Sequence, residues 1–389
     1  MVTTKAQTAR SPRIRLGMVG GGRDAFIGAV HRIAARMDDH YELVAGCFSS
    51  SADKALASAA DLGVARAYTD FAQMAVREAK RKDGIEAVAI VTPNHMHAPV
   101  ALQFLRRGIH VICDKPLTHS LPEAKRLAKA AKASGVVFAL THNYTGYPMV
   151  RQARAMVAAG DLGEIRLVQV EYAQDWLTEP LEASGQKQAG WRTDPAQSGA
   201  GGSTGDIGTH AFNLAGFVTG LEVAELAADL QAFVPGRRVD DNAHVMLRYA
   251  NGARGMLWCS QVAAGCENAL RLRVFGTRAG LDWAQEDPNY LWITPFGSPR
   301  TRITRNGAGA GPEAGRVSRI PPGHPEGYLE GFANIYTEVA RALQARRTGT
   351  PPDPAVTFPG LAEGVAGVAF VDACVRSSAR NAAWVKLNL

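Results

Sequence analysis

The glycines that follow the first apolar segment have the spacing of a phosphate-binding loop. Residues 20–25 read GGGRDA and satisfy the G-x-G-x-x-G/A pattern between a strand-like segment and a helical one. In this pattern Gly20 allows a tight turn, Gly22 lets a pyrophosphate approach the backbone, and Ala25 keeps the helix close to the sheet. The helix N-terminus stabilises the phosphate charge. We expect a dinucleotide here rather than a glycine-rich turn without a ligand, and the predicted contacts are Gly20, Gly22, Ala25, Phe26 and Ile27.

The end of the next β-rich segment bears on the choice between NAD and NADP. An acidic side chain normally binds the ribose hydroxyls of NAD at this point, but the sequence places Ser49, Ser50 and Lys54 there instead. Two hydroxyls and an ammonium group suit a 2′-phosphate, so NADP is slightly favoured. If the serines only cap the following helix, Asp53 could still serve NAD.

A parallel sheet has to position these two loops. The first half of the chain alternates β-rich segments with segments of helical periodicity, which is typical of an α/β Rossmann fold. The expected strands are Ile14–Gly20, Leu43–Phe48, Ile85–Val91, His110–Asp114 and Val136–Leu140, with a short one near Ala67 and Tyr68. The expected helices include Ala98–Arg107 and Leu121–Ser134.

The pattern changes after about Thr145, where apolar and polar residues begin to alternate along the strand candidates. This predicts a C-terminal α+β domain built on an open, mainly antiparallel sheet. Its expected strands are Ile165–Tyr172, His244–Tyr249, Arg254–Ser260, Leu270–Phe275 and Leu281–Trp283, and its expected helices are Pro148–Ala159, Tyr328–Arg346 and Leu361–Ser377. Two stretches without periodicity, Glu182–Ser203 and Thr301–Gly323, are predicted to be loops.

A chain of 389 residues is too long for one ordinary core and suits two domains. The predicted division is an N-terminal tail at 1–12, a Rossmann dinucleotide-binding domain at 13–145, and a substrate and oligomerisation domain at 146–389. The C-terminal helices of the second domain are in a position to pack back on the first. An open sheet leaves one face to cover, so we expect a homodimer or homotetramer.

Composition excludes several classes of function. The chain has no stretch of about 18 apolar residues and no apolar leader, which predicts a cytoplasmic protein that does not bind membranes. Its formal net charge of +7 is dispersed rather than gathered in a tract, so nucleic-acid binding is not expected. The five cysteines form an odd set without a CxxC pair and are predicted to be buried, reduced thiols.

Three further motifs make a family recognisable. Residues 91–97 read VTPNHMH, residues 113–117 read CDKPL, and residues 202–210 read GSTGDIGTH. Together with the glycine loop, in this order and spacing, they resemble the Gfo/Idh/MocA oxidoreductases over nearly the whole chain. The resemblance implies a Rossmann domain that carries NAD(P) and a sheet domain that holds the substrate. It also implies a catalytic set for alcohol–ketone interconversion, which by position is Lys115, Asp206 and His210.

The chemistry of hydride transfer suits these residue types. Taking a hydride from a carbinol requires removal of the hydroxyl proton, for which a histidine with a pKa near neutrality is suited. Asp206 stands four residues before His210 and would share its helix face, where it could orient the histidine or bind a neighbouring substrate hydroxyl. Lys115 follows a parallel strand and could stabilise a developing alkoxide. Which of Lys115 and His210 is the base stays open. Taken singly, the three residues could instead be a pinned surface lysine, a helix cap and a core histidine.

The resemblance adds cofactor contacts and two departures. The turn Thr92-Pro93-Asn94 contacts the cofactor in the family, and His97 is expected to open the next helix beside it. Asp114 stands where the family usually has glutamate, and Asn213 stands where many relatives have an acidic residue. The remaining predicted cofactor contacts are Asp114, Lys115 and Pro116, and the Lys115–Pro116 peptide bond is expected to be cis. His95 and His97 lack a third ligand, so no metal site is predicted.

The substrate contacts are predicted from polar and aromatic residues around the same motifs, and aromatic faces beside polar groups suit a polyhydroxylated ring. The tryptophans among them could equally belong to the core or to a subunit contact. The predicted set is Asn143, Tyr144, Asp175, Trp176, Trp191 and Arg192, together with Lys115, Asp206 and His210.

The favoured function is hydride transfer between NAD(P) and a secondary alcohol or ketone of a sugar, inositol or related polyol. One alternative is an NAD-dependent enzyme that cleaves glycosides by transient oxidation and elimination. Another is a non-catalytic dinucleotide-sensing regulator, which the lysine, aspartate and histidine set argues against.

Overall fold

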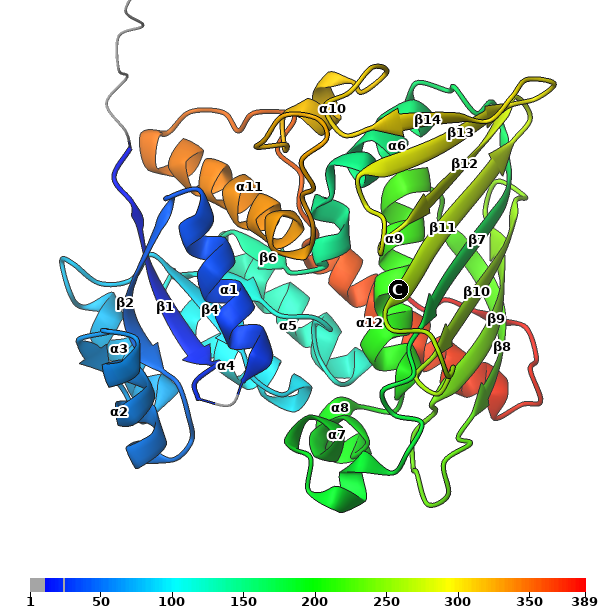
Figure 1. Cartoon of the computed structure of the whole chain (residues 1–389). Coiled ribbons are helices and arrows are strands. Elements are labelled where there is room, and N and C mark those ends of the chain that lie inside the picture. The colour runs from blue at the N-terminus through cyan, green and yellow to red at the C-terminus, as the bar shows by residue number, and fades with distance from the viewer. Residues whose placement is uncertain (1–10, 24) are drawn as a thin grey trace, which may run out of the picture.

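The computed structural model describes residues 11–23 and 25–389, so most of the predicted tail and Asp24 of the glycine loop lie outside the described residues. The N-terminal part is a parallel sheet with strand order β3-β2-β1-β4-β5-β6 (Figure 1). The order reverses between β1 and β4, which makes the carboxyl ends of these two strands the place where an open α/β sheet binds a ligand. The strands are β1 (Ile14–Gly20), β2 (Tyr41–Cys47), β3 (Arg66–Ala67), β4 (Ala87–Val91), β5 (His110–Cys113) and β6 (Phe138–Leu140).

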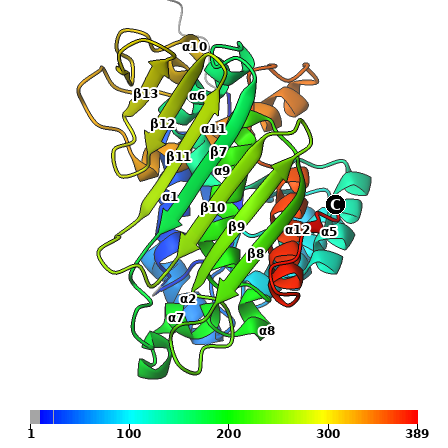
Figure 2. The ribbon, with the colours of Figure 1, turned by 90° about the vertical axis from the view of Figure 1, so that its right-hand side faces the viewer.

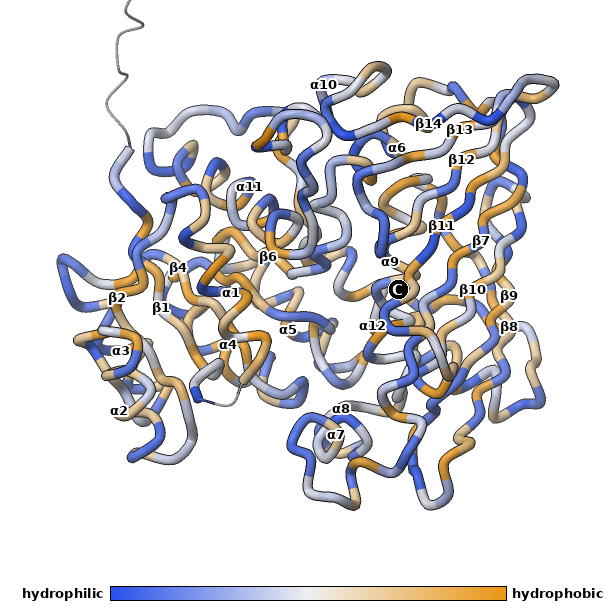
Figure 3. The backbone as a smooth tube through the Cα atoms, viewed as in Figure 1, coloured by the Kyte–Doolittle hydropathy of each residue, from blue (hydrophilic) through white to orange (hydrophobic). Residues whose placement is uncertain are grey.

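Helices cover both faces of this sheet. On one face Val88 and Ile90 of β4 belong to a core cluster with Phe104 and Leu127. On the other face Ala87 and Ala89 pack in a second cluster with residues of α1 and α11. The apolar character of β4 and α4 is visible in Figure 3. The helices are α1 (Phe26–Met37), α2 (Ala52–Asp61), α3 (Phe71–Ala79), α4 (His97–Leu105), α5 (Leu121–Ser134) and α11 (Tyr328–Thr348).

The C-terminal part is built on a larger sheet with strand order β14-β13-β12-β11-β7-β10-β9-β8-β15. The prediction of a mainly antiparallel sheet is confirmed, but β7 and β10 pair in parallel at its centre. They do so because a long helical excursion separates β7 from the β8–β10 meander, and only such a crossover lets two strands run in the same direction. The strands are β7 (Ile165–Ala173), β8 (Val223–Gln231), β9 (Asn242–Tyr249), β10 (Arg254–Ser260), β11 (Ala269–Gly276), β12 (Ala279–Ala284), β13 (Tyr290–Pro295), β14 (Thr301–Thr304) and β15 (Val385–Lys386).

Only one face of the larger sheet is covered by helices within the described chain. The helices α6 (Pro148–Ala158), α9 (Thr209–Thr219) and α12 (Leu361–Ser378) lie between the two sheets. Figure 2 shows the opposite face of the sheet without a helix in front of it. Buried and accessible residues alternate along β11 and β12, as expected for strands with one face on the core.

The two stretches predicted to be loops contain short elements, so that expectation was wrong. The first holds η3 (Leu181–Ser184), α7 (Lys187–Arg192) and α8 (Pro195–Ser198), and the second holds β14 and α10 (Pro312–Gly315). Each helix is shorter than two turns, so no apolar period could reveal it. The side chains of Gln186 and Asp194 cap α7 and α8 by accepting backbone hydrogen bonds from Ala189 and Ala196.

Candidate active site

The glycine loop between β1 and α1 has the close approaches of a dinucleotide cradle. Gly20 has φ +80°, and a Cβ there would lie 2.3 Å from the carbonyl oxygen of Val91. A Cβ on Gly22 would lie 2.7 Å from the Phe48 carbonyl oxygen and from Ser58 Oγ. No larger residue fits either position without displacing backbone, so the loop leaves open the space that a pyrophosphate requires. The residues present therefore fit the cofactor that the motif implies.

The role predicted for Ala25 belongs instead to a glycine one turn later. Ala25 is the N-cap of α1, whereas a Cβ on Gly28 would come within 2.4 Å of Gly21 Cα. The close contact between helix and strand is therefore made at Gly28, which the sequence motif did not indicate. Phe26 is 70% exposed at the tip of this loop, and Ile27 is half-buried beside it.

The loop after β2 leaves polar groups accessible where the sequence predicts the adenosine ribose. Ser49 is half-buried, and its hydroxyl accepts a hydrogen bond from the backbone of Ser51 at 3.1 Å. Ser50 and Lys54 are exposed, as is Asp53 in the first turn of α2. Ser51 is the N-cap of α2, so neither predicted serine caps the helix.

The predicted turn after β4 is tied to its neighbours by two polar side chains. His97 begins α4, as predicted, and its ring lies between two carbonyls, with Nδ1 2.7 Å from Pro116 O and Nε2 2.9 Å from Thr92 O. Asn94, in η1 (Asn94–Met96), donates from Nδ2 to the carbonyl of Ser198 at 2.9 Å. The loop that carries Thr92 and Pro93 is thus joined to the segment after β5 and to α8.

Lys115 follows β5, and its peptide bond to Pro116 is cis, as predicted. Its Nζ donates to Asp206 Oδ1 at 2.7 Å and to the Asp206 carbonyl at 2.6 Å. The other carboxylate oxygen of Asp206 accepts from Gln261 Nε2 at 2.9 Å and lies 3.3 Å from Arg192 Nε. Burial raises the pKa of Asp206, but the Lys115 and Arg192 charges outweigh it and hold the pKa below its ordinary value. The carboxylate is therefore ionised at neutral pH and fixes the lysine ammonium.

A buried carboxylate holds the start of the segment that carries Asp206. Asp240 accepts hydrogen bonds from the backbone of Gly202 and Thr204 and from the hydroxyls of Ser203 and Thr204. The segment after it, η4 (Thr204–Gly208), is a π-helical turn that continues into α9. Such turns are frequent at functional sites. Asp206 and His210 are therefore not on one α-helix, and their relative placement differs from that expected of an i, i+4 pair.

His210 does not contact Asp206 through a hydrogen bond, which contradicts the expectation that the aspartate orients it. Its Nδ1 lies 3.4 Å from Nδ1 of His142, and its ring packs edge-on against Tyr144 at 4.9 Å between centroids. Burial, and then the positive charge of Lys115, lowers the pKa of His210 well below its ordinary value. The same causes lower the pKa of His142 to about 3. Both imidazoles are neutral at pH 7, so His210 has a free lone pair, but its pKa lies below the near-neutral value expected from the sequence.

Asp114, which replaces the usual glutamate, keeps its carboxylate in the site. Its Oδ1 accepts from Thr141 Oγ1 and from the Lys115 backbone, both at 2.9 Å, and lies 3.7 Å from Nε2 of the buried His31. Burial raises the pKa of Asp114, but His31 and Lys115 lower it by a larger amount. The pKa therefore lies below its ordinary value, and the carboxyl is ionised. Asn213, the other departure, is buried on α9, and its Oδ1 has no hydrogen-bond partner in the part of the chain that the structure describes.

Some of the predicted substrate residues lie beside His210 or Asp206, and others make contacts further away. Tyr144 lies next to His210, and Arg192 lies next to Asp206 with its guanidinium over the Trp191 ring at 4.3 Å. Asn143 is buried beside Tyr144, and within residues 11–23 and 25–389 its Nδ2 has no hydrogen-bond partner. Asp175 instead binds the backbone of Gly265 at 3.0 Å, so its carboxylate is directed to a neighbouring loop. Trp176 donates to Gln174 Oε1 at 3.1 Å and faces Arg192 at 6.0 Å.

The structure adds polar and aromatic residues that sequence reasoning did not identify. Tyr172 and Tyr144 share a 2.5 Å hydrogen bond between their hydroxyls, and Tyr172 also donates to Asn268 Oδ1. His142 and Gln261 join the set through the contacts described above. His142 stands two residues after β6, at the carboxyl edge of the parallel sheet, and this position was the available signal. The others carry no local motif.

Comparison with known proteins agrees with this arrangement. Residues 14–142 match the family model "Oxidoreductase family, NAD-binding Rossmann fold", and residues 150–282 match "GFO/IDH/MocA C-terminal domain". The chain is 34% identical to the uncharacterized oxidoreductase YfiI of Bacillus subtilis over 97% of both chains. Among solved structures, an oxidoreductase from Sinorhizobium meliloti is 63% identical, with TM-score 0.89, and covers 96% of this chain and 100% of its own.

A second solved structure is described with its ligands. The inositol dehydrogenase homologue of Azotobacter vinelandii, complexed with NADH and myo-inositol, is 37% identical with TM-score 0.90, and the match covers 97% of this chain and 98% of that one. The glycine cradle, the Lys115–Asp206 pair and both family models point the same way. The chain belongs to the Gfo/Idh/MocA family and is an NAD(P)-dependent oxidoreductase acting on CH–OH groups.

Proposed function

We propose that the protein transfers a hydride between NAD(P) and a secondary alcohol or ketone of a sugar, inositol or related polyol. The bound nicotinamide supplies or accepts the hydride. The main support for this proposal lies at the carboxyl edge of the parallel sheet. The Lys115 ammonium group is fixed there by the Asp206 carboxylate, and it adjoins the neutral, buried imidazole of His210. The myo-inositol complex of the Azotobacter homologue supports this class of substrate.

Each residue of the set has a separate task in this proposal. Lys115 holds the reacting oxygen and stabilises negative charge that develops on it. His210 takes the hydroxyl proton in oxidation and returns it in reduction. Asp206 fixes the ammonium and, through the oxygen shared with Arg192 and Gln261, binds a neighbouring substrate hydroxyl. The rest of the wall around the reacting ring is formed by Tyr144, Trp176, Trp191, Arg192 and Asn143.

An activity screen tests the proposal directly. Purified protein is incubated with NAD+ or NADP+ and a panel of inositols, aldoses and glycosides, and absorbance at the reduced-nicotinamide wavelength is followed. We expect a stoichiometric rise with at least one free polyol. Consumption of a glycoside without net cofactor reduction would instead identify the glycoside-cleaving reaction. Cofactor binding with no turnover of any compound would identify a sensor.

We expect NADP to be used somewhat better than NAD. The end of β2 offers Ser49, Ser50 and Lys54 and no carboxylate, and the last two are exposed and available to a 2′-phosphate. Replacing Ser49 with aspartate should reverse the preference, because the new carboxylate repels the 2′-phosphate and can bind the ribose hydroxyls. The measurement is kcat/KM for both cofactors in the wild type and in Ser49→Asp. A wild type that clearly prefers NAD would contradict this interpretation.

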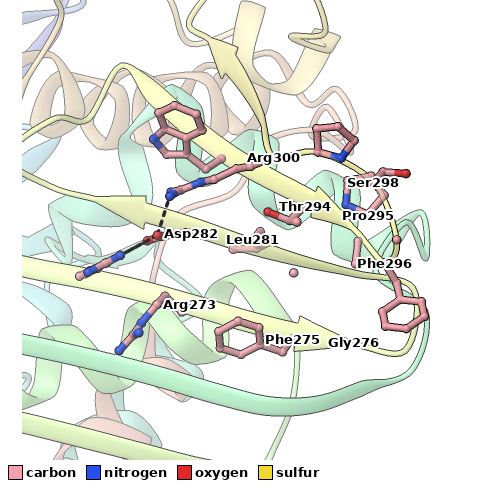
Figure 4. Close-up of a pocket in the computed structure, with 16 residues that line it drawn as sticks. Arg273, Phe275, Gly276, Leu281, Asp282, Thr294, Pro295, Phe296, Ser298 and Arg300 are labelled. Atoms are coloured by element: carbon pink, nitrogen blue, oxygen red, sulfur yellow. Dashed lines mark hydrogen bonds and ion pairs between the residues drawn. The ribbon is translucent and has the colours of Figure 1, made fainter.

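We propose that two or four copies assemble through the uncovered face of the larger sheet. Leu167, Met246 and Met256 project from β7, β9 and β10 on this face, and each is about half exposed. The face also has a depression of about 820 Å³ over β11–β13. Figure 4 shows Asp282 bridged to Arg300 there, with Phe296 directed away from the sheet. Apolar patches of this kind mark interaction surfaces.

Light scattering at micromolar concentration should report a dimer or a tetramer. The double variant Met246→Lys/Met256→Lys places charges at directly paired positions of β9 and β10 and should shift the protein toward monomer without changing its circular dichroism. A wild-type protein that is monomeric at this concentration would refute the proposed assembly.

We propose that the protein is located in the cytoplasm. The five cysteines are free, and four of them are buried, which supports a reducing cytoplasm. Within the described chain no helix is long and apolar enough to cross a membrane.

We place the boundary between the dinucleotide-binding and substrate domains at residues 145 and 146, within η2 (Asn143–Gly146), because β6 ends before it and α6 begins after it.

A further inference from the structure

An open pocket of about 850 Å³ adjoins the candidate active site, and the proposed reaction at a single ring does not use it. It lies where the loop before β11, the turn after β12 and the start of α11 meet. Its volume falls in the range of roughly 300–1,000 Å³ that is typical of small-molecule sites. The residues that matter to its chemistry are Tyr147, Glu267, Asn268, Gln285, Glu286 and Tyr328.

Tyrosine side chains join this pocket to the reacting centre. The Tyr144 ring lies 4.9 Å from that of His210 and 6.3 Å from that of Tyr328, measured between centroids. Asn268 donates to the Tyr144 hydroxyl at 3.4 Å from the pocket side. Burial, and then Tyr144 and the Asp114 carboxylate, raises the pKa of Tyr328 well above its ordinary value. Tyr328 therefore forms a wall shared by the pocket and the active site.

The lining has the chemistry of a neutral carbohydrate site. It offers amides from Asn268 and Gln285, carboxylates from Glu267 and Glu286, and the rings of Tyr147 and Tyr328. Aromatic faces beside hydrogen-bonding groups suit the apolar and hydroxyl-bearing sides of a sugar ring. No lysine or arginine is among its lining residues, so the two carboxylates disfavour a phosphate or a carboxylate ligand.

Some of these polar groups are available to a ligand. Among the described residues, neither the Glu267 carboxylate nor the Tyr328 hydroxyl has a hydrogen-bond or ion-pair partner, and Glu267 is exposed. Glu286 and Gln285 are already held by Asn268, at 2.9 Å in each case. The pocket thus combines a fixed amide platform with free acceptor and donor groups.

We propose that this pocket binds a second sugar unit, so that the preferred substrate is a disaccharide or a glycosylated polyol whose other ring reacts beside Lys115 and His210. This inference rests on the proposed hydride transfer to or from a polyol. The reacting ring lies on the His210 side of Tyr144 and Tyr328, and the glycosidic bond passes Tyr328 into the pocket. No bond of the second sugar is made or broken.

The test pairs single rings with their glycosides: glucose with maltose, galactose with lactose, and myo-inositol with a galactosyl-myo-inositol. We expect at least one glycoside to exceed its parent ring by tenfold or more in kcat/KM. Glu267→Trp fills the pocket from an exposed loop position and should abolish that advantage while leaving kcat/KM for the parent ring within twofold. The matched control is Glu42→Trp, because Glu42 is exposed on β2 and has no side-chain partner among the described residues, and this variant should retain the advantage.

Calorimetry with the same glycosides on the cofactor-loaded protein separates this inference from the proposed function. Binding that Glu267→Trp weakens at least tenfold supports the subsite even if no probe is oxidised, whereas absent turnover would contradict the proposed function. The subsite is overturned if no glycoside surpasses its parent ring in turnover or binding. It is also overturned if Glu267→Trp lowers the values for ring and glycoside equally.

Discussion

Replacing Lys115 with alanine should lower kcat by roughly 10²–10⁴, the usual effect of removing a group that stabilises charge or transfers a proton. The ammonium is held at 2.7 Å by the Asp206 carboxylate, so it is preorganised and needs no rearrangement during the reaction. Its loss also leaves the ionised Asp206 with Gln261 and Arg192 as its only side-chain partners among the described residues, which should weaken substrate binding. The effect on kcat/KM should therefore be at least as large as that on kcat.

Two variants sharpen this prediction. Lys115→Arg should not restore activity, because a planar guanidinium cannot reproduce the two short bonds that one ammonium makes to the carboxylate and the carbonyl of Asp206. Lys129→Ala removes an exposed lysine of α5 and is the control, with kcat expected to stay at the wild-type level. Steady-state kinetics with saturating cofactor and polyol provides the measurement. A Lys115→Ala enzyme within tenfold of wild type would exclude the proposed role.

Replacing His210 with glutamine should lower kcat by roughly 10²–10⁴ and remove the acidic limb of its pH dependence, while cofactor affinity stays near normal. A base must be unprotonated to accept the hydroxyl proton, so the rate of oxidation rises as pH passes upward through its pKa. Burial and Lys115 lower the pKa of His210, which places this limb below the ordinary histidine range and leaves kcat flat around neutrality. If Lys115 were the base instead, the limb should persist in His210→Gln and disappear in Lys115→Met.

His142 is the matched control for this assignment. It is an equally buried histidine with a pKa lowered to about 3, and its Nδ1 lies 3.4 Å from that of His210. His142→Gln should keep the acidic limb and most of the activity, because Tyr144 still packs against the His210 ring. Profiles of kcat against pH for both variants and for Lys115→Met decide the matter. An unchanged profile in His210→Gln, or loss of the limb in His142→Gln alone, would show that His210 is not the base.

Elements with strong local signals could be predicted from the sequence. The bounds of α5 are as predicted, because Pro122 stands in its first turn and Gly135, at φ 66°, ends it in the left-handed conformation. The bounds of β1 and β10 were also predicted correctly, since Pro12 and Gly21 flank the first and the Asn251–Gly252 turn precedes the second. The parallel pairing of β7 with β10 could not be predicted, because strand partners more than 80 residues apart are chosen by tertiary packing.

The candidate site likewise contains residues with a local sequence signal and residues that only tertiary packing brings together. The glycine loop and the segments around Lys115 and Asp206 carry motifs, and the structure brings that lysine and that aspartate into contact. No motif marks the pocket residues Asn268, Gln285 and Tyr328, because they come from three separate segments of the chain. They meet through the order of strands β7, β11 and β12 in the sheet and through the return of α11. The π-helical turn at Asp206 was also hidden, since its sequence fits an ordinary helix.

The return of α11 to the N-terminal sheet has a consequence for synthesis of the chain. Phe332, Ile335, Tyr336 and Val339 complete the cluster that contains Ile14, Leu16 and Met18. The Tyr41 hydroxyl donates to the Tyr336 carbonyl at 2.8 Å, across 295 residues of sequence. A nascent chain therefore cannot close the first core until its last sixth is emerging from the ribosome. Until then an apolar sheet face stays accessible, so we expect the N-terminal half expressed alone to aggregate where the whole chain stays in solution.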